Sequence, residues 1–270
     1  MVSVIITTYN SSRYIDHCIH SIRNSEGIGP IEIIVVDNNS TDDTADIARK
    51  ALAVVYNKGP ERSAQRNYGV ANSYGKYVMI LDVDMTIHPR LIKECIAKCE
   101  TYDGLYIPEI VVDQDLDLDC WDRVYKREKY WVKVRRYERS FYNGTRVDAI
   151  RFMKRSHWIE YDVELTGAED WDHDRRFAGK KGITELPLWH NEELFNIKTY
   201  AKKKAYYSQW LDIYKKRYGN VPELNPVYRY FGVFVEDGKW KKIIRHPIFF
   251  LAMMYLRVIV GIAYLKTKKL

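Results

Sequence analysis

The sequence predicts an α/β fold, a mostly parallel sheet with helices on both faces, which continues into a basic helical extension. Short apolar runs rich in valine and isoleucine alternate with helical patterns through the first hundred residues, as is typical of proteins with parallel sheets. The uneven distribution of charged residues along the chain indicates the basic extension. Residues 198–270 carry 16 basic and 4 acidic side chains, whereas residues 1–197 carry 27 and 32. We therefore expect a sheet domain followed by an electrostatically distinct tail.

Strand and helix units account for residues 1–100, which we expect to bind the main ligand. The expected strands cover residues 2–10, 31–37, 54–55 and 76–84. The expected helices cover residues 14–25, residues 63–73 and a segment that ends at Lys50, with Ser40 as its predicted N-cap. Ligands of parallel sheets bind at the carboxyl ends of the strands, and four polar residues are predicted to gather there: Asn10, Asp37, Asp82 and Asp84.

The pattern is less regular in residues 101–196, which we expect to shape a second substrate site. The expected features are an acidic loop, a charged aromatic segment, a strand and a helix, at residues 113–119, 121–141, 149–153 and from Glu169 onward. Residues 197–270 form the tail. It contains a helical stretch rich in lysine and tyrosine that runs to Gly219 and an apolar segment at 247–265.

Composition excludes several classes of protein. Hydrophobic residues make up 46% of the 270 residues and charged residues 29%, values unlike those of disordered or collagen-like chains. The cysteines show no CxxC spacing, so neither a zinc site nor a disulfide framework is indicated at Cys18, Cys95, Cys99 and Cys120. Met1 is followed directly by a strand-like run instead of a leader pattern, and we expect the catalytic part to lie in the cytoplasm.

The strongest chemical signal is the triplet Asp82, Val83 and Asp84 at the end of an apolar strand. Alternate residues of a strand point to opposite sides, so both carboxylates reach one cation only if the chain turns after the strand. Carboxylate oxygens suit Mg²⁺ or Mn²⁺, which in turn neutralises a nucleotide diphosphate. An isolated triplet of this kind is more often a solvated acidic turn, but here it lies beside the expected ligand edge.

Several motifs, in the same order, resemble those of glycosyltransferase family 2, inverting enzymes with a GT-A fold and nucleotide-sugar donors. The run 2–10 is similar to the family's opening strand, although Thr7 stands where proline is common. The run 31–44 resembles its second strand, and the run 63–85 resembles its Arg-Asn-x-Gly helix followed by the metal-binding DxD triplet. The resemblance covers about residues 1–195, and the ordered set is much more specific than any single motif.

The resemblance implies roles for individual residues. The implied donor-binding residues are Thr8, Tyr9, Asn10, Asp37, Arg66, Asp82, Val83 and Asp84. Asp82 and Asp84 would hold Mg²⁺ or Mn²⁺, and His190 is a candidate third metal ligand. A structural histidine is the equally weighted alternative, since imidazole suits Mg²⁺ less well than oxygen does. UDP- and GDP-sugars are the expected donors, bound by residues 1–100.

The run 166–177 looks like the family's Glu-Asp motif, whose aspartate serves as catalytic base. Inverting transfer to a hydroxyl is a direct displacement, so a carboxylate must take the acceptor proton, and Asp170 is the predicted base. Glu169 is predicted to orient it, and its spacing from Thr166 also fits a capping box at the start of a helix. The later acidic residues of the motif are expected to be solvated or paired with its arginines.

The apolar segment at 247–265 is long enough to span a membrane and carries one charge, Arg257. Its ten leucine, isoleucine, valine and phenylalanine residues favour insertion by about 3 to 6 kcal/mol. The central arginine opposes insertion by roughly 2.5 to 3.5 kcal/mol. A helix lying in the membrane interface, with Arg257 reaching outward and basic flanks on anionic headgroups, therefore competes with a spanning helix. We favour membrane association over a core helix, and no nucleic-acid-binding motif is present.

The sequence thus predicts a metal-dependent inverting glycosyltransferase at the cytoplasmic face of a membrane. The expected acceptor is a hydroxyl of a lipid-linked sugar or other cell-surface glycan. A polyprenyl phosphate acceptor is an alternative that would need no base, because its oxygen is already ionised. A nucleotidyltransferase would need a glycine-rich loop after the first strand, and residues 7–14 contain no glycine. A non-catalytic nucleotide- or glycan-binding scaffold is the remaining alternative.

Overall fold

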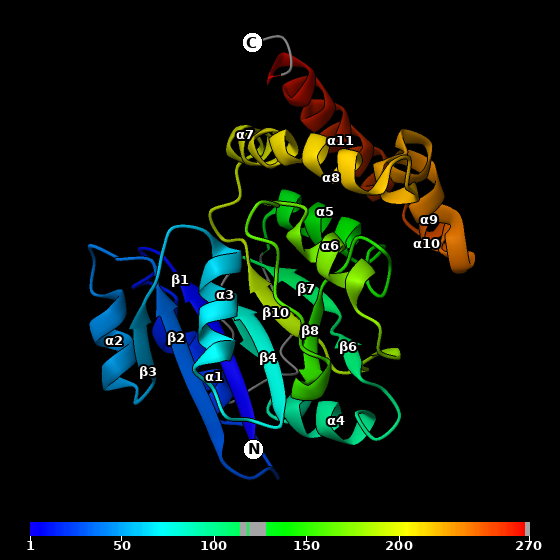
Figure 1. The fold of residues 1–270 in the computed structure, drawn as a ribbon. Coiled ribbons are helices and arrows are strands. Elements are labelled where there is room, and N and C mark those ends of the chain that lie inside the picture. Colours follow the sequence, from blue (N-terminus) through cyan, green and yellow to red (C-terminus); the bar gives the residue numbers. More distant parts are fainter. Residues whose placement is uncertain (114–117, 119–127, 268–270) are drawn as a thin grey trace.

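The computed structural model describes residues 1–113, 118 and 128–267. Most of the expected acidic loop at 113–119, the first part of the segment 121–141 and Cys120 lie outside the described residues. The described chain forms a seven-stranded sheet, a three-stranded sheet and a layer of helices from the tail (Figure 1). The predicted α/β fold with its helical extension is therefore confirmed.

Four parallel strands form one half of the large sheet. They are β3 (Val54–Asn57), β2 (Ile31–Asp37), β1 (Val2–Thr8) and β4 (Tyr77–Asp82), in this spatial order. The other half consists of β8 (Ile150–Lys154), β6 (Gly104–Tyr106) and β9 (Lys181–Ile183). β8 is antiparallel to its neighbours β4 and β6, and β9 is parallel to β6. The small sheet pairs β10 (Leu188–Asn191) with β5 (Met85–Ile87) and β7 (Glu109–Val112). This pairing places β10 beside β5, the strand that follows β4 in the chain.

Helices cover both faces of the large sheet because side chains alternate along its strands. Val4 and Ile6 of β1 pack in one core, and Ile5 packs in a second core on the other face. A side-chain carbon at Gly69 would lie 2.4 Å from Ile5, so glycine is required where its helix approaches β1. The elements that precede the tail are α1 (Ile15–Arg23), α2 (Thr44–Lys50), α3 (Arg62–Ala71), α4 (Leu91–Lys98), α5 (Tyr130–Arg139), the 3₁₀ turn η1 (Arg155–His157) and α6 (Glu169–Arg176).

Two of the element boundaries that differ from the expected ones affect the candidate ligand edge. The prediction of Ser40 as N-cap is wrong: α2 begins at Thr44, because Ser40 instead donates its hydroxyl to Asp37 at 2.6 Å. The fourth strand ends at Asp82, and Val83 and Asp84 form a turn that leads into β5. This turn is the condition under which the two carboxylates can serve one cation.

The tail folds back over α5 (Figure 1). Its longest helix, α11, packs along α5 and α7, and Val134 of α5 shares a core with Phe234, Met253 and Leu256. The elements of the tail are α7 (Ile197–Tyr207), η2 (Ser208–Trp210), α8 (Leu211–Tyr218), η3 (Pro222–Leu224), η4 (Tyr228–Gly232), α9 (Val233–Val235), η5 (Glu236–Gly238), α10 (Trp240–Arg245) and α11 (Pro247–Thr267).

Arg257 corrects the expectation that this side chain reaches outward. It is 8% exposed and lies 3.1 Å from Glu138 Oε1 of α5. Its guanidinium also donates to the hydroxyl of Tyr142 and to the carbonyl of Arg229. A buried charge is tolerated only when it is paired and hydrogen-bonded, and these partners meet that requirement. The inward ion pair ties α11 to α5.

The opposite face of α11 is apolar and exposed. Its side chains recur at alternating intervals of three and four residues, as on one side of a helix. We call this set the outer stripe: Ile248, Leu251, Tyr255, Val258, Ile262 and Leu265, each at least 50% exposed. Among the helices described, Pro247–Lys266 is the segment long and apolar enough to cross a membrane, and little of it is buried in the protein.

Candidate functional site

The carboxyl ends of β1, β2 and β4 form the edge at which the predicted donor-binding residues lie. In the strand register Thr8 faces Asp37 across β1 and β2, and Thr7 faces Asp82 across β1 and β4. The side chains of Thr8, Asp37 and Asp82 therefore meet at one edge although they are far apart in sequence. This arrangement follows from the parallel pairing that the alternating pattern predicted.

Asp37 organises the loops at this edge. Its carboxylate is buried and accepts hydrogen bonds from the Thr8 hydroxyl at 2.8 Å and from the Ser40 amide at 2.7 Å, in addition to the Ser40 hydroxyl. The Asn10 side-chain oxygen accepts from the Thr41 amide at 2.8 Å. Tyr9, in contrast, is 59% exposed and open to a ligand. The structure thus joins the first two motifs through a hydrogen-bonded loop.

The two carboxylates of the DxD triplet have different partners. Asp82 lies 3.2 Å from Arg66 and 3.5 Å from Arg151. Burial raises the pKa of Asp82, but these two cations prevail and lower it far below its usual range. Asp84 Oδ2 lies 3.2 Å from His190 Nε2. The other oxygen, Asp84 Oδ1, is buried and has no hydrogen-bond partner among the described residues. That oxygen is free to accept a ligand.

His190 lies between two carboxylates. Its Nδ1 is 2.6 Å from Glu109 Oε1, on the side away from Asp84. Burial favours the neutral imidazole, but the charges of Asp84 and Glu109 prevail and raise the pKa of His190 well above its usual value. Glu109 also pairs with Arg139 at 2.7 Å and with Arg151 at 3.5 Å. The structure therefore places His190 beside Asp84 of the triplet, with Glu109 on its other side.

The described residues contain no ready-made group of three or more His, Cys, Asp or Glu side chains that could hold a metal. The ion pairs give the physical reason, since Asp82 turns toward Arg66 and Arg151 while Asp84 turns toward His190. Mg²⁺ is commonly held by one or two carboxylates together with substrate phosphates, so a partial protein site is sufficient. The free oxygen of Asp84 fits such a site.

Arg66 connects the DxD triplet to the Glu-Asp motif. This side chain of α3 is 1% exposed, and its two terminal nitrogens lie 3.2 Å from Asp82 and 3.0 Å from Asp170. Its guanidinium also stacks over the ring of Tyr161, 4.8 Å from the centroid. Residues 82 and 170, which come from different halves of the chain, therefore lie on either side of one buried cation.

The two acidic residues of the Glu-Asp motif have separate environments. Glu169 is 1% exposed and pairs with Arg62 at 2.5 Å, whereas the Asp170 side chain is 31% exposed. The predicted capping box with Thr166 is absent: Ala168 is the N-cap of α6 and no side chain caps it, because Glu169 turns to Arg62 instead. Asp170 is therefore the member of the pair that a substrate can reach.

Electrostatics separates these two carboxylates further. Burial raises the pKa of Glu169, as does the adjacent charge of Asp170, although Arg62 opposes both. Burial also acts on Asp170, but Arg66, Arg62 and Arg151 together lower its pKa below the usual range. Environments that drive the pKa values of two neighbouring carboxylates apart are common where one of the two is used in acid–base chemistry. Asp170 is ionised at neutral pH, the state that a general base requires.

The later acidic residues of the motif are structural. Asp172 pairs with Arg176 at 2.6 Å, as predicted, and also with Arg217. The expectation that Asp174 is solvated or paired with a motif arginine is wrong, because Asp174 is buried and pairs with Lys181 at 2.9 Å. Arg175 pairs instead with Glu223 of the tail at 2.5 Å.

Sequence reasoning missed three charged residues behind the site: Glu109, Arg139 and Arg151. Each is at least 85% buried as a side chain, and together they link His190 to Asp82. Arg151 carried a recognisable signal, since it is a charged residue within the apolar run 149–153. Glu109 and Arg139 carried none, because a charge at a strand end or on a helix is ordinarily solvated.

Comparison with known proteins identifies the class. Residues 3–161 match the family model described as glycosyl transferase family 2, which is more than half of the chain. This chain belongs to glycosyltransferase family 2. It is 32% identical over 253 residues to the Bacillus subtilis protein named "Putative glycosyltransferase EpsH", covering 85% of this chain and 71% of EpsH. The succinoglycan biosynthesis protein ExoO of Rhizobium meliloti is 28% identical over 106 residues, and this match spans only 30% of ExoO.

Solved structures confirm the GT-A fold. The mannosyltransferase PcManGT of Pyrobaculum calidifontis, in complex with GDP-Man and Mn²⁺, matches with a TM-score of 0.63 at 15% identity, over 98% of this chain and 86% of that one. S. aureus TarS matches with a TM-score of 0.55 at 18% identity, over 97% and 88%. The protein is accordingly a glycosyltransferase, and membership of this family argues against both the nucleotidyltransferase and the scaffold alternatives.

Proposed function

We propose that this glycosyltransferase moves a sugar, with inversion, from a UDP- or GDP-sugar to a hydroxyl of a lipid-linked or other cell-surface glycan. The observation that carries the proposal is that the buried Arg66 pairs with both Asp82, at the proposed donor edge, and Asp170, which is partly exposed. Relatives in complex with UDP-GlcNAc and with GDP-Man support the class of donor. The polyprenyl phosphate acceptor remains a second candidate, since it would use the same donor site.

The donor would lie along the edge formed by β1, β2 and β4. Thr8, Tyr9, Asn10 and Asp37 would contact the base and ribose, and Arg66, Asp82, Val83 and Asp84 would lie near the diphosphate. In this division residues 1–100 bind the donor, residues 101–196 supply the acceptor side and residues 197–270 form the tail. Carboxylates and a cation at the ends of parallel strands fit this placement.

Asp84, Asp82 and His190 would hold Mg²⁺ or Mn²⁺, which would neutralise the charge of the leaving diphosphate. The unpartnered oxygen of Asp84 supports this assignment. Related structures that contain Mn²⁺ or Mg²⁺ together with nucleotide support it further. Because a histidine must be neutral to ligate a metal, His190 would release a proton when the site fills.

In the chemical step the acceptor oxygen attacks the anomeric carbon, and the bond from that carbon to the diphosphate oxygen breaks. Asp170 takes the proton of the acceptor hydroxyl, and the nucleoside diphosphate leaves with the bonding electrons. Arg66 keeps Asp170 ionised before transfer and would lie close to the charge that develops on the diphosphate. Glu169 is held by Arg62 and acts as a positioning residue for α6.

The configuration of the product tests the single-displacement mechanism. With an α-linked UDP- or GDP-sugar as donor we expect a β-linked product, which the anomeric coupling constant in a proton NMR spectrum reports directly. An α-linked product would contradict the role of Asp170, because retention requires a different mechanism.

Membrane association is the second part of the proposal. The outer stripe and its basic neighbours Lys241, Arg245 and Lys266 suit a helix lying in the plane of the interface. A spanning α11 would have to leave Glu138 and expose the core it shares with α5, so the in-plane orientation is favoured. In the cell the outer stripe would contact the cytoplasmic face of the membrane.

Flotation with phosphatidylglycerol vesicles tests this orientation. We expect Val258→Glu to weaken binding on the order of tenfold, because it places a charge on the outer stripe. Val163→Glu is the matched control, since both valines are 52% exposed and Val163 lies in the loop before α6, not on the outer stripe. Equal binding of the two variants would contradict membrane contact through the stripe.

A further inference from the structure

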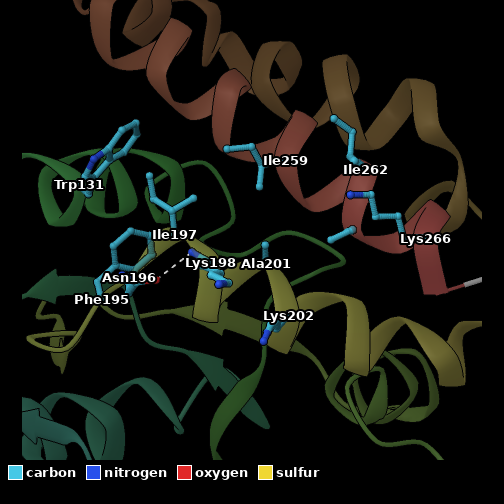
Figure 2. A pocket seen from close by; sticks show the side chains of 11 residues that line it. Trp131, Phe195, Asn196, Ile197, Lys198, Ala201, Lys202, Ile259, Ile262 and Lys266 are labelled. Carbon is cyan, nitrogen blue, oxygen red and sulfur yellow. Dashed lines mark hydrogen bonds between the residues drawn. The ribbon is translucent and has the colours of Figure 1, made fainter.

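A groove lies between α5, α7 and α11, away from the DxD triplet. Its volume is about 710 Å³, within the range of roughly 300 to 1,000 Å³ that is usual for small-molecule sites. Most of its wall is apolar, and Figure 2 shows Ile259 of α11 above Phe195 and Ile197. Trp131 and Ile262 extend the apolar lining. The groove can therefore accept a hydrocarbon chain.

Three cations border this apolar wall. Lys198 and Lys202 are four residues apart on α7, and Lys266 lies in the last turn of α11 (Figure 2). None of the three pairs with a carboxylate in the part of the chain that the structure describes. Apolar walls beside unpaired lysines complement a molecule with a hydrocarbon chain and an anionic head. An acidic protein helix would fit the lysines but not the apolar wall, and a second copy of the basic tail would be repelled.

The groove lies next to the outer stripe at one end, and the chain that lines its other end leads toward the candidate active site. Ile262 belongs both to the groove and to the outer stripe, so a chain can enter the groove directly from the bilayer surface. At the other end, Phe195 follows His190 by five residues, a stretch that spans at most roughly 18 Å. Glu192, within that stretch, pairs with Arg135 of α5 at 2.9 Å and fixes the position of the segment.

We propose that this groove seats the acceptor, with its single lipid chain against the apolar wall and its phosphate or diphosphate head on Lys198, Lys202 and Lys266. The inference rests on the proposed function, which it deepens by assigning the acceptor a lipid phosphate carrier and a place in the fold. The sugar attached to that head would extend along residues 190–195 toward Asp170.

Isothermal titration of the full chain with farnesyl diphosphate, a soluble lipid diphosphate, tests the groove. Divalent metal is omitted so that the DxD triplet does not recruit the diphosphate. We expect farnesyl diphosphate to bind at least tenfold more tightly than dimethylallyl diphosphate or inorganic diphosphate. Lys202→Glu should weaken binding at least tenfold, whereas Lys203→Glu, the same charge reversal at an exposed position outside the groove lining, should change it less than twofold.

Three results would overturn the proposal: no binding of farnesyl diphosphate, no dependence on chain length, or equal weakening by the two lysine variants. Because both lysines are exposed on α7, both variants should fold, and circular dichroism verifies this. Binding of UDP and GDP with Mn²⁺ is measured on the same samples. If the unaltered protein binds a nucleotide but not farnesyl diphosphate, the groove proposal alone is wrong. If the unaltered protein binds no nucleotide, the proposed function is wrong.

Discussion

Asp170→Asn should lower kcat for transfer to a hydroxyl acceptor by roughly 10²- to 10⁴-fold, the usual contribution of a general base. The amide can still accept the hydrogen bond from Arg66, so the site should keep its shape, but it cannot take a proton. Donor affinity should stay within about twofold, because the loss falls on the transition state. Steady-state kinetics combined with titration of the donor nucleotide measures both quantities.

Glu164→Gln is the matched control, an exposed carboxylate-to-amide change in the loop before α6. Near-normal transfer to the hydroxyl acceptor by Asp170→Asn would refute the base role. Near-normal transfer by the same variant to a polyprenyl phosphate alone would favour that acceptor, whose oxygen needs no deprotonation. The pH profile gives an independent reading. Because Arg66 and its neighbours hold the pKa of Asp170 below its usual range, protonation of Asp170 should not lower the rate of the metal-saturated enzyme until the pH drops below the ordinary value near 3.8.

Arg66→Leu should lower the free energy of unfolding by about 3 to 5 kcal/mol, the cost of breaking a buried charge network on one side. Arg66 is 1% exposed and lies within 4.0 Å of Asp82, Glu169 and Asp170. Without it these carboxylates would face one another with fewer cations. Urea denaturation at neutral pH measures the change.

Arg49→Leu is the control for this measurement. Arg49 also pairs with an aspartate, Asp46, but both side chains are more than half exposed, so the change should be under about 1 kcal/mol. If Arg66→Leu were no more destabilising than Arg49→Leu, the network would not be the structural link between the two motifs. The expected loss should also shrink in acid, because protonation of Asp82 and Asp170 below their lowered pKa values removes the charges that Arg66 balances.

The sequence predicted the parts of the site that depend on local pattern. Alternating strands and helices place Asp37 and Asp82 at one edge, and the apolar run before the triplet marks its strand as buried. Such features follow from side-chain periodicity and from the geometry of parallel sheets. The family resemblance assigned Arg66 and Asp170 to one active site, but their direct contact was not predicted, because no local rule relates positions 104 residues apart.

The features that sequence reasoning missed arise from tertiary contacts. Glu109 supports His190 only because β7 and β10 pair in the small sheet. Arg257 was expected to reach outward since an isolated apolar helix must bring its charge to water, yet Glu138 of α5 provides a buried partner. Both cases required knowing which elements pack together, information that periodicity within one segment does not contain.

Titration of UDP and GDP into the protein, with and without Mn²⁺, tests the central claim that the DxD triplet forms a metal-dependent nucleotide site. The account predicts that one nucleotide binds at least tenfold more tightly with Mn²⁺ and that Asp84→Asn removes this gain. Asp46→Asn, at an exposed position on α2, should retain it. Failure of folded protein to bind any nucleotide, or an unchanged Mn²⁺ effect in Asp84→Asn, would contradict the account.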